Sequence, residues 1–381
     1  MRHTIGALRR HGYEVYAVDR DPAAPAFAAA DGSAPVDIRD APAIIDYARR
    51  IGADLIMPVN EAGVMAEAVA SAALGLPGLP VEVARRCLDK GEMRAAWRRA
   101  GLPQPDFRVV GTLEEARAAA LDLGYPVVVK PTCGWGSRGV GLVPAAGELE
   151  DAYAAADAYR DGGAIIVETF LPGTLLTSDG FVRDGETSVL ILGDVAQQNH
   201  RRFLVNFALN YPAAIPAAVE AEARRVIAGA TEALGLRTGA FHCELMRVGD
   251  RVFLIELGAR GGGGHLFGMI TEAGSGVPAP PTLAALMLGR PADIRPLRRR
   301  GVCYHFFSAP EGVVTAIDGV DEARSVPGVL DFGVQIKVGM AGGEVAMDAS
   351  RHGYCVAGGD SRDEAVAAAR AAIARVRFSV A

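Results

Sequence analysis

Two glutamates and an arginine on one predicted hairpin are the residues best suited to carry chemistry. Residues 239–260 are predicted to form two strands, with Glu244 in the first, Glu256 in the second and Arg260 just beyond. The intervening turn, Val248-Gly-Asp-Arg251, contains the Gly and Asp that short hairpin loops favour. Two carboxylates on neighbouring strands repel each other unless a cation lies between them. The pattern therefore indicates a divalent metal site beside an arginine that can hold a phosphate or carboxylate.

The hairpin alone leaves a second interpretation open, in which its acidic residues form a solvated face. Glu256, however, is flanked by Leu254, Ile255 and Leu257. Ionised carboxylates are rarely placed in so apolar a run without a partner. This surrounding favours the metal site.

A lysine and a glycine-rich loop earlier in the chain indicate phosphate binding. Tyr125-Pro-Val-Val-Val-Lys-Pro131 is predicted to be a buried strand carrying Lys130, and the loop at residues 132–140 follows at once. Backbone N–H groups of such a loop can close around phosphate oxygens, while the lysine supplies countercharge. The loop matches neither the P-loop nor the dinucleotide fingerprint, and a tight hairpin that needs glycine is the alternative. Lys90, before a predicted helix that runs through Arg99, would by itself be an ordinary surface lysine.

Three further segments are candidates for ligand contacts. The strand that begins at Ala164 ends in Glu168-Thr-Phe-Leu171, where a carbonyl and an N–H could meet the edge of an adenine. Gly261-Gly-Gly-Gly-His265 lets the backbone approach a substrate closely, or is a flexible connector. The polar patch from Gln197 to Arg202, with Asn206, is predicted to contact a substrate carboxylate, although His200 is equally compatible with a solvated loop.

The elements before residue 88 alternate between helices and strands. A helix is predicted over residues 2–11, a buried parallel strand over 14–19, and a second strand over 54–58 after an intervening helix. A doubly wound domain normally begins with a strand and a glycine turn. We therefore expect that the first strand of this domain is missing.

Composition limits the classes of partner. The 381 residues are 50% hydrophobic and 22% charged, which fits a globular protein of two or three domains. A net charge of -6 gives no electrostatic footprint for nucleic acid or an anionic membrane, so small molecules are the expected partners. No apolar run approaches the roughly 20 residues that span a bilayer, and no signal-peptide core begins the chain. A cytoplasmic location is expected.

The cysteines indicate neither a disulfide framework nor a catalytic nucleophile. All five lack CxxC spacing, so neither zinc nor a disulfide network is indicated. Cys133 and Cys243 lie beside the motifs above. A catalytic thiol would need a base that the sequence does not identify.

Taken in order, these motifs resemble the ATP-grasp superfamily over nearly the whole chain. The set is Lys90, Lys130, the glycine loop, Glu168 to Leu171, Glu244, Glu256 and Arg260. The resemblance implies an α/β and α+β ATP-grasp fold in three parts. These are a doubly wound pre-ATP-grasp domain at 1–88, an ATP-grasp domain with a glycine-loop lid at 89–296, and a small C-terminal ligase domain at 297–381.

The resemblance also implies a role for each site residue. It implies ATP as cosubstrate, with Mg²⁺, or Mn²⁺ in its place, held by Glu244 and Glu256. Arg260 and Lys130 would be catalytic, and Arg260, Gly262, Gly263 and His200 would contact the substrate. The ATP contacts would be Lys90, Lys130, Gly134, Gly136, Ser137, Gly139, Glu168, Thr169, Phe170 and Leu171. In this scheme Glu168 offers its carbonyl and Leu171 its N–H to the adenine.

Within the superfamily, the chain is most similar to the carbamoyl phosphate synthetase-like and biotin carboxylase-like branch, especially L-amino acid ligases that make dipeptides. The tail carries this similarity through Pro310 to Ile317, a predicted strand at Ile336-Lys-Val-Gly339, Arg351 to Gly358 and a helix from Arg362. Two positions depart from the family pattern. Gly258 replaces an asparagine that assists the metal, and Leu175 replaces a ribose-binding acid.

The resemblance implies an ATP-dependent carboxylate-amine ligase that activates a carboxylate, expected to be an amino acid, as an acyl phosphate. An amine would then give an amide or peptide bond, with release of ADP and phosphate. The alternatives are a bicarbonate-using carboxylase or purine-pathway ATP-grasp enzyme, and a non-catalytic nucleotide-binding relative. Homodimers are common in the family, so a homodimer is compatible with the resemblance.

Overall fold

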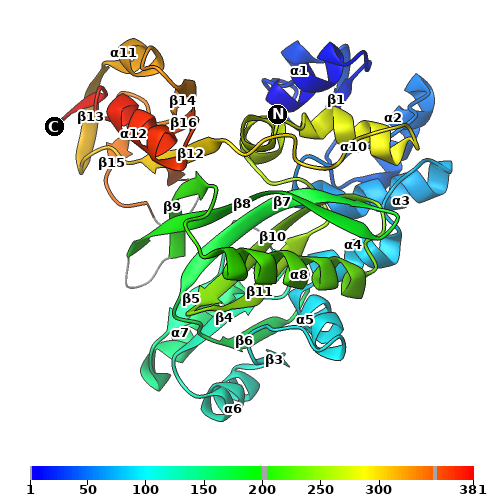
Figure 1. Cartoon of the computed structure of the whole chain (residues 1–381). Helices are drawn as coiled ribbons and strands as arrows, with labels where there is room; N and C mark the ends of the chain where they lie inside the picture. The colour runs from blue at the N-terminus through cyan, green and yellow to red at the C-terminus, as the bar shows by residue number, and fades with distance from the viewer. Residues whose placement is uncertain (1, 135, 200–203, 346–349) are drawn as a thin grey trace.

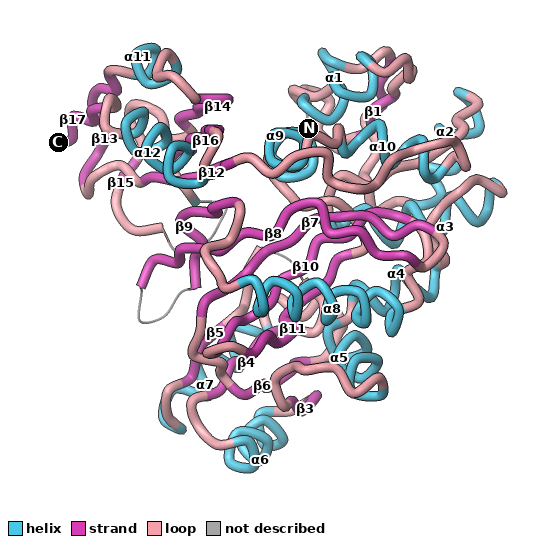
Figure 2. Tube along the Cα trace, in the orientation of Figure 1, coloured by secondary structure: helices cyan, strands magenta, loops and turns pink. Residues whose placement is uncertain are grey.

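The computed structural model describes residues 2–134, 136–199, 204–345 and 350–381. Within these residues, the strands form sheets of two, four, eight and three strands. In Figure 1 the four-stranded sheet lies below β10 and β11, helix α1 and the C-terminal helices lie above the large sheet, and α3 and α4 lie beside it. Figure 2 shows that helices cover the outer sides of these sheets. None of the described helices combines the length and apolar character needed to cross a membrane.

The N-terminal part contains a short parallel sheet, as expected for a doubly wound domain. β1 pairs in parallel with β2, and the N-terminal part also contains helices α1 to α4. The elements are α1 (Arg2–Arg10), β1 (Tyr16–Val18), η1 (Phe27–Ala29), β2 (Gly32–Ala34), α2 (Ala41–Ile51), η2 (Glu61–Gly63), α3 (Val64–Leu74) and α4 (Val81–Leu88).

The strand predicted at residues 54–58 is wrong, because no strand is assigned there. A strand requires a ladder of hydrogen bonds to a neighbour, and the described structure pairs β1 only with β2. Ile56 and Met57 still pack against buried residues of the N-terminal part and of α10 (Ala279–Met287), respectively. The segment is therefore held by apolar packing rather than by a sheet.

The four-stranded sheet has the order β3-β6-β4-β5, with antiparallel neighbours. Its apolar face packs on α6 and α7 around Val127, Val129, Ile165 and Val167. The elements are α5 (Lys90–Arg99), β3 (Phe107–Val110), α6 (Leu113–Leu123), β4 (Val127–Pro131), β5 (Gly141–Val143), η3 (Ala146–Glu148), α7 (Leu149–Asp157) and β6 (Ile165–Thr169). The predicted helix from Lys90 to Arg99 is confirmed, and the Asp89 side chain caps it by accepting from the Glu92 N–H.

The eight-stranded antiparallel sheet, in the order β11-β10-β7-β8-β9-β12-β16-β14, forms the centre of the molecule. α8 covers one face, as Figure 1 shows, and contributes Val226, Ile227 and Leu234 to the largest core. The elements are β7 (Thr174–Arg183), β8 (Glu186–Asn199), β9 (Leu204–Tyr211), α8 (Ala217–Leu234), β10 (Gly239–Val248), β11 (Arg251–Gly258), η4 (Leu266–Ile270), α9 (Thr271–Ser275), α10, β12 (Gly301–Phe307), β14 (Val329–Val334) and β16 (Gly353–Gly359). The predicted hairpin at 239–260 is thus confirmed.

The C-terminal part extends the large sheet and adds a small one. β12, β16 and β14 continue the large sheet beyond β9. Strand pairing therefore continues across residue 297, where the C-terminal domain was predicted to begin. β13 (Gly312–Asp318), β15 (Ala341–Gly342) and β17 (Arg377–Val380) form the three-stranded sheet. α11 (Val320–Arg324) contacts β14, and α12 (Arg362–Ile373) packs on β12 and β16 of the large sheet. The helix predicted from Arg362 is confirmed. The strand predicted at 336–339 is wrong, because β14 ends at Val334 and Ile336 instead donates its N–H to the His352 carbonyl outside the ladder.

Candidate active site

A cleft of about 470 Å³ lies between the four-stranded sheet and the large sheet, and Asn60 and Glu61 of the N-terminal part also line it. This volume is within the range of small-molecule sites. The predicted site residues that line the cleft are Lys90, Lys130, Gly134, Gly136, Ser137, Glu168, Thr169, Phe170, Leu171, Glu244, Glu256, Arg260 and Gly263. Gly139 and Gly262 are not among the lining residues, and His200 lies outside the described residues. The structure therefore brings together side chains that are up to 170 positions apart in the chain, from Lys90 to Arg260.

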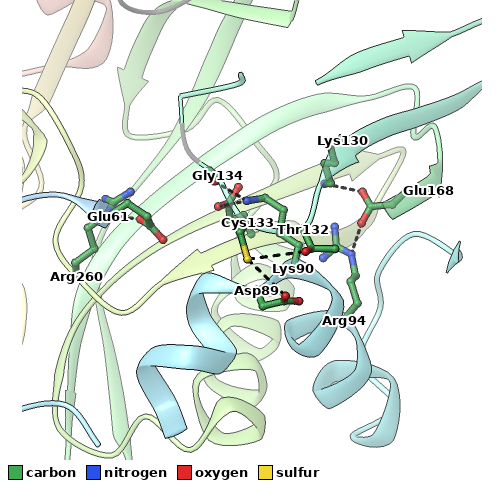
Figure 3. Close-up of polar contacts among 11 residues, drawn as sticks. Glu61, Asp89, Lys90, Arg94, Lys130, Thr132, Cys133, Gly134, Glu168 and Arg260 are labelled. Atoms are coloured by element: carbon green, nitrogen blue, oxygen red, sulfur yellow. Dashed lines mark hydrogen bonds and ion pairs between the residues drawn. The ribbon is translucent and has the colours of Figure 1, made fainter. Parts of the chain in front are cut away.

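Lys130 is held at the cleft by a buried carboxylate. Lys130 Nζ lies 2.6 Å from Glu168 Oε2, and Arg94 Nε lies 2.6 Å from Glu168 Oε1 (Figure 3). Glu168 is 3% exposed and Arg94 is fully buried. Burial opposes ionisation of Glu168, yet Arg94 and Lys130 together hold its pKa at about 2. The carboxylate of Glu168 thus fixes Lys130, a side-chain role that the sequence analysis did not assign.

Arg94 is a residue that the sequence analysis missed. It follows Lys90 by four positions on α5, so both side chains lie on the same face of that helix. Both are buried, whereas Arg98 and Arg99 of the same helix are not. The spacing from Lys90 was the available signal, but Arg94 is one of several arginines in the segment.

Lys90 lies between the metal-site hairpin and the glycine loop. Its Nζ is 2.9 Å from Glu256 Oε1 and also donates a 2.9 Å hydrogen bond to the Gly134 carbonyl. Burial disfavours the charged form of Lys90, but Glu256 outweighs this effect and raises the pKa of Lys90. Burial likewise opposes ionisation of Glu256, while Lys90, Lys130 and Arg260 lower the pKa of Glu256. Both groups are therefore charged where the loop meets the hairpin.

Glu244 and Glu256 lie directly opposite each other across β10 and β11. Thr177 of β7 is in register with Glu244, and all three residues line the cleft. Carboxylate oxygens on adjacent strands are the ligands that hard divalent cations prefer. Glu244 and Glu256 are therefore the residues of the cleft that could hold a Mg²⁺ ion.

Arg260 is positioned by a residue almost 200 positions earlier. Arg260 Nε donates to Glu61 Oε2 at 2.6 Å (Figure 3). Its Nη1 donates to the Gly261 carbonyl at 2.8 Å. A Cβ added at Gly258 would lie 3.2 Å from Glu61 Oε2. The Glu61 carboxylate thus lies beside the position where relatives carry an asparagine. Glu61 gave only a weak signal in the sequence. It follows the apolar segment at 54–58, and ligands of doubly wound folds bind beyond the carboxyl ends of such segments when they form strands.

Asp179 was also missed, and it organises the start of the glycine run. It is 2% exposed; its Oδ1 accepts from the Gly262 N–H at 2.7 Å and its Oδ2 lies 3.1 Å from His242 Nδ1. The N–H of Gly262 is therefore directed at Asp179, while Gly263 and Gly264 form the cleft wall. His242, which lines the cleft, is thus held by Asp179. Asp179 stands between Ser178 and Gly180, so it lacks the apolar neighbours that made Glu256 stand out in the sequence.

One end of the cleft is apolar and is built largely by the large sheet and its C-terminal strands. Its lining includes Leu175, Val195, Leu209, Leu266, Tyr304 and Phe306. The Arg351 guanidinium lies 3.7 Å from the Phe306 ring centroid and donates a 2.7 Å hydrogen bond to the Asn206 carbonyl. Asn206 and Arg351 also line the cleft, so part of the predicted polar patch does reach it.

The structure gives no support to a nucleophilic Cys133. Its Sγ lies 3.5 Å from Asp89 Oδ2. Burial and the Asp89 carboxylate raise the pKa of the Cys133 thiol, which disfavours the reactive thiolate.

Two protein-family models match the chain. The model for the ATP-grasp domain matches residues 123–267, and the model for L-amino acid ligase C-terminal domain 2 matches residues 305–381. The chain belongs to the ATP-grasp superfamily and is an enzyme of the ATP-grasp ligase type. The predicted superfamily and fold class are thereby confirmed.

Among curated proteins, the chain is similar to the formate-dependent phosphoribosylglycinamide formyltransferase of Thioalkalivibrio sulfidiphilus. The two are 31% identical, and the match covers 100% of this chain and 94% of that relative. The enzyme of the same name from Corynebacterium efficiens is 32% identical over 98% of this chain and 92% of its own length. Among solved structures, the L-amino acid ligase from Bacillus licheniformis matches with a TM-score of 0.84 and 23% identity, over 100% of this chain and 97% of that chain.

Proposed function

We propose that the protein is an ATP-dependent carboxylate-amine ligase that activates its acid as an acyl phosphate. The observation that carries this proposal is the arrangement of one cleft, in which Lys90, Lys130 and the paired Glu244 and Glu256 lie together with Arg260. The first four groups suit a nucleotide polyphosphate and its cation. Arg260 suits a carboxylate beside them.

In the first step, a carboxylate oxygen of the acid attacks the γ-phosphorus of ATP, and the bond from that phosphorus to the ADP oxygen breaks. Lys90 and Lys130 offset the negative charge on the transferring phosphoryl group. A Mg²⁺ ion held by Glu244 and Glu256 would supply further charge neutralisation there. The Glu168 carboxylate and the Glu256 carboxylate hold the two lysines in place, so little reorganisation is needed.

In the second step, the amine nitrogen attacks the carbonyl carbon of the acyl phosphate. The carbon-oxygen bond to phosphate breaks, phosphate leaves, and the amine loses a proton. Arg260, fixed by Glu61, is the group suited to hold first the carboxylate and then the tetrahedral oxyanion. The same chemistry applies whether the acid is formate or an amino acid.

For the substrates, the names of the curated relatives favour the purine-pathway alternative over peptide-bond formation. Both relatives described above are named as formate-dependent enzymes that act on phosphoribosylglycinamide. Formate with a phosphorylated glycinamide amine is therefore the first pair that we propose. Arg351 lines the same cleft, and its guanidinium is the kind of group that binds phosphate.

An amino acid pair is the second candidate, and two observations favour it. The C-terminal residues 305–381 match the L-amino acid ligase domain. The cleft wall formed by Val195, Leu209, Leu266 and Phe306 also suits a substrate with an apolar side chain, which formate lacks.

The experiment is a measurement of ADP and phosphate release over a matrix of acids and amines, with mass analysis of the product. Glu256→Gln should reduce acid-dependent ADP release by about 10³-fold, because it removes charge from the cation site. Asp250→Asn, in the exposed turn of the same hairpin, is the matched control and should retain full activity. Unchanged turnover in Glu256→Gln would overturn the assignment of this site.

The remaining alternatives give different outcomes in the same assay. ADP release that depends on bicarbonate rather than on another acid would identify a carboxylase. ATP binding without ADP release for any pair would identify a non-catalytic relative. Either result would contradict the proposed ligase.

A further inference from the structure

Outside the nucleotide site, three segments that are far apart in the chain bring two histidines and an aspartate together. His3 lies on α1, His265 follows the glycine run after β11, and Asp331 lies on β14. His265 Nε2 is 2.9 Å from Asp331 Oδ2, and His3 Nε2 is 3.3 Å from the same oxygen. One donor atom from each residue lies within 4.8 Å of the other two. The cluster joins the N-terminal helix, the wall of the active site and the C-terminal part.

These distances are close to those of a metal-ligand shell. In a tetrahedral zinc site with ligand bonds of about 2.0–2.1 Å, neighbouring donor atoms are roughly 3.3 Å apart. The two histidine-aspartate separations already approach this value, so only a small adjustment of the side chains would be needed. Two imidazole nitrogens and a carboxylate oxygen suit a borderline divalent metal such as Zn²⁺ better than Mg²⁺.

A second layer of hydrogen bonds orients two of the three donors. The Tyr304 hydroxyl is 3.1 Å from His265 Nδ1, and the Tyr354 hydroxyl donates to Asp331 Oδ2 at 3.1 Å. A hydroxyl can accept from Nδ1–H, which leaves the Nε2 lone pair of His265 directed at the cluster. Such outer partners are typical of metal-binding histidines and carboxylates.

The cluster is open on one side. The side chain of His3 is 42% exposed, whereas those of Asp331 and His265 are 26% and 16% exposed. A metal can therefore enter from solvent, and a water can complete its shell. A site with three protein ligands and an exchangeable fourth position is a common zinc arrangement.

The geometry points to a second metal site, in which His3 Nε2, His265 Nε2 and Asp331 Oδ2 bind one Zn²⁺ ion. It is distinct from the Mg²⁺ site at Glu244 and Glu256, which offers only oxygen ligands. Tyr304, which orients His265, also lines the active-site cleft together with Gly264. A bound ion would thus link α1 and β14 to the glycine run that follows Arg260.

The test is a titration of tag-free, metal-stripped protein with Zn²⁺ in excess Mg²⁺, followed by calorimetry and by thermal melting. One equivalent of Zn²⁺ should bind with a Kd of about 1 µM or tighter and should raise the Tm. His3→Ala and Asp331→Asn should each weaken binding by at least about tenfold and abolish the rise in Tm. His11→Ala, just beyond the end of α1, is the matched control and should bind as the unaltered protein does.

Co²⁺ provides a second readout that does not depend on folding of a variant. Its visible spectrum should show nitrogen and oxygen ligands without a thiolate charge-transfer band. Equal Zn²⁺ affinity in the unaltered protein, His3→Ala and Asp331→Asn would overturn the site, and so would a thiolate band or no binding above the Mg²⁺ background. None of these outcomes bears on the ligase reaction, because binding is measured without ATP.

Discussion

The two ends of the active-site cleft are built in different ways. At the nucleotide end, buried ion pairs on helices and strands fix the reactive groups: Lys130 with Glu168 and Arg94, and Lys90 with Glu256. At the substrate end, Arg260 is held by Glu61 from the N-terminal part, and the apolar wall comes largely from the large sheet and its C-terminal strands. The first end suits the ATP chemistry that we propose for this cleft. The second end depends on contacts between distant segments, and it is the part that can change with the substrate.

The largest expected effect is on the stability of the nucleotide end. Glu168→Gln should lower the free energy of unfolding by about 3–5 kcal/mol, because it leaves two buried cations without their carboxylate. Denaturant unfolding measures this value. The control is Glu150→Gln, which removes an ion pair to Arg117 whose side chains are 70% and 55% exposed. That change should cost less than about 1 kcal/mol, and equal costs for the two variants would show that the buried cluster contributes nothing special.

Glu67 is a second buried glutamate, and it can be compared with Glu168, which pairs with two cations. Glu67 on α3 is 4% exposed and its carboxylate accepts from the Ser71 hydroxyl at 3.1 Å. Burial raises the pKa of Glu67 to about 7, the opposite of the shift at Glu168. The folded state therefore favours the protonated acid, and stability is lost as the pH rises from the ordinary value near 4.5 through about 7.

Glu67→Gln should remove this loss. Its Tm should exceed that of the unaltered protein at pH 8, with a gain of up to about 3 kcal/mol in unfolding free energy. At pH 4.5 the two proteins should melt alike. Thermal melting across this range measures the difference, and a gap that stays constant with pH would contradict the raised pKa of Glu67.

The smallest expected effect concerns the substrate end. Glu61→Gln keeps a hydrogen-bond acceptor for Arg260 but removes the charge, so kcat/KM for the acid should fall by about tenfold. The KM for ATP should stay the same, because Lys90 and Lys130 are untouched. Glu82→Gln, at an exposed position of the N-terminal part, is the control and should change neither value. Steady-state kinetics would contradict the positioning role if the KM for ATP rose instead.

The difference between the two ends of the cleft also explains which residues could be predicted from the sequence. Lys130 at the end of a strand, the glycine loop and Glu256 in an apolar run each carry a local signal, and the structure places them in one cleft. The turn sets the hairpin register as far as the pair Leu245 and Leu254. A β-bulge between Glu244 and Leu245, which the sequence did not indicate, then sets Glu244 opposite Glu256.

The residues that were missed depend on contacts between distant segments. Arg94 differs from the other arginines of α5 only in its burial against Glu168, and Glu61 meets Arg260 only after the whole chain has folded. The segment 54–58 has the apolar composition of a strand, but a ladder also needs a neighbour, and composition does not report one. Local patterns thus predicted the shared chemistry, whereas the positioning contacts required the three-dimensional structure.

The central claim is that the acid becomes an acyl phosphate in this cleft. It is tested most directly by supplying the acid with both carboxylate oxygens labelled with ¹⁸O and analysing the released phosphate by mass spectrometry. The proposed reaction transfers one labelled oxygen from the acid to phosphate for each amide formed. Phosphate that carries no label, while the amide product accumulates, would contradict the account.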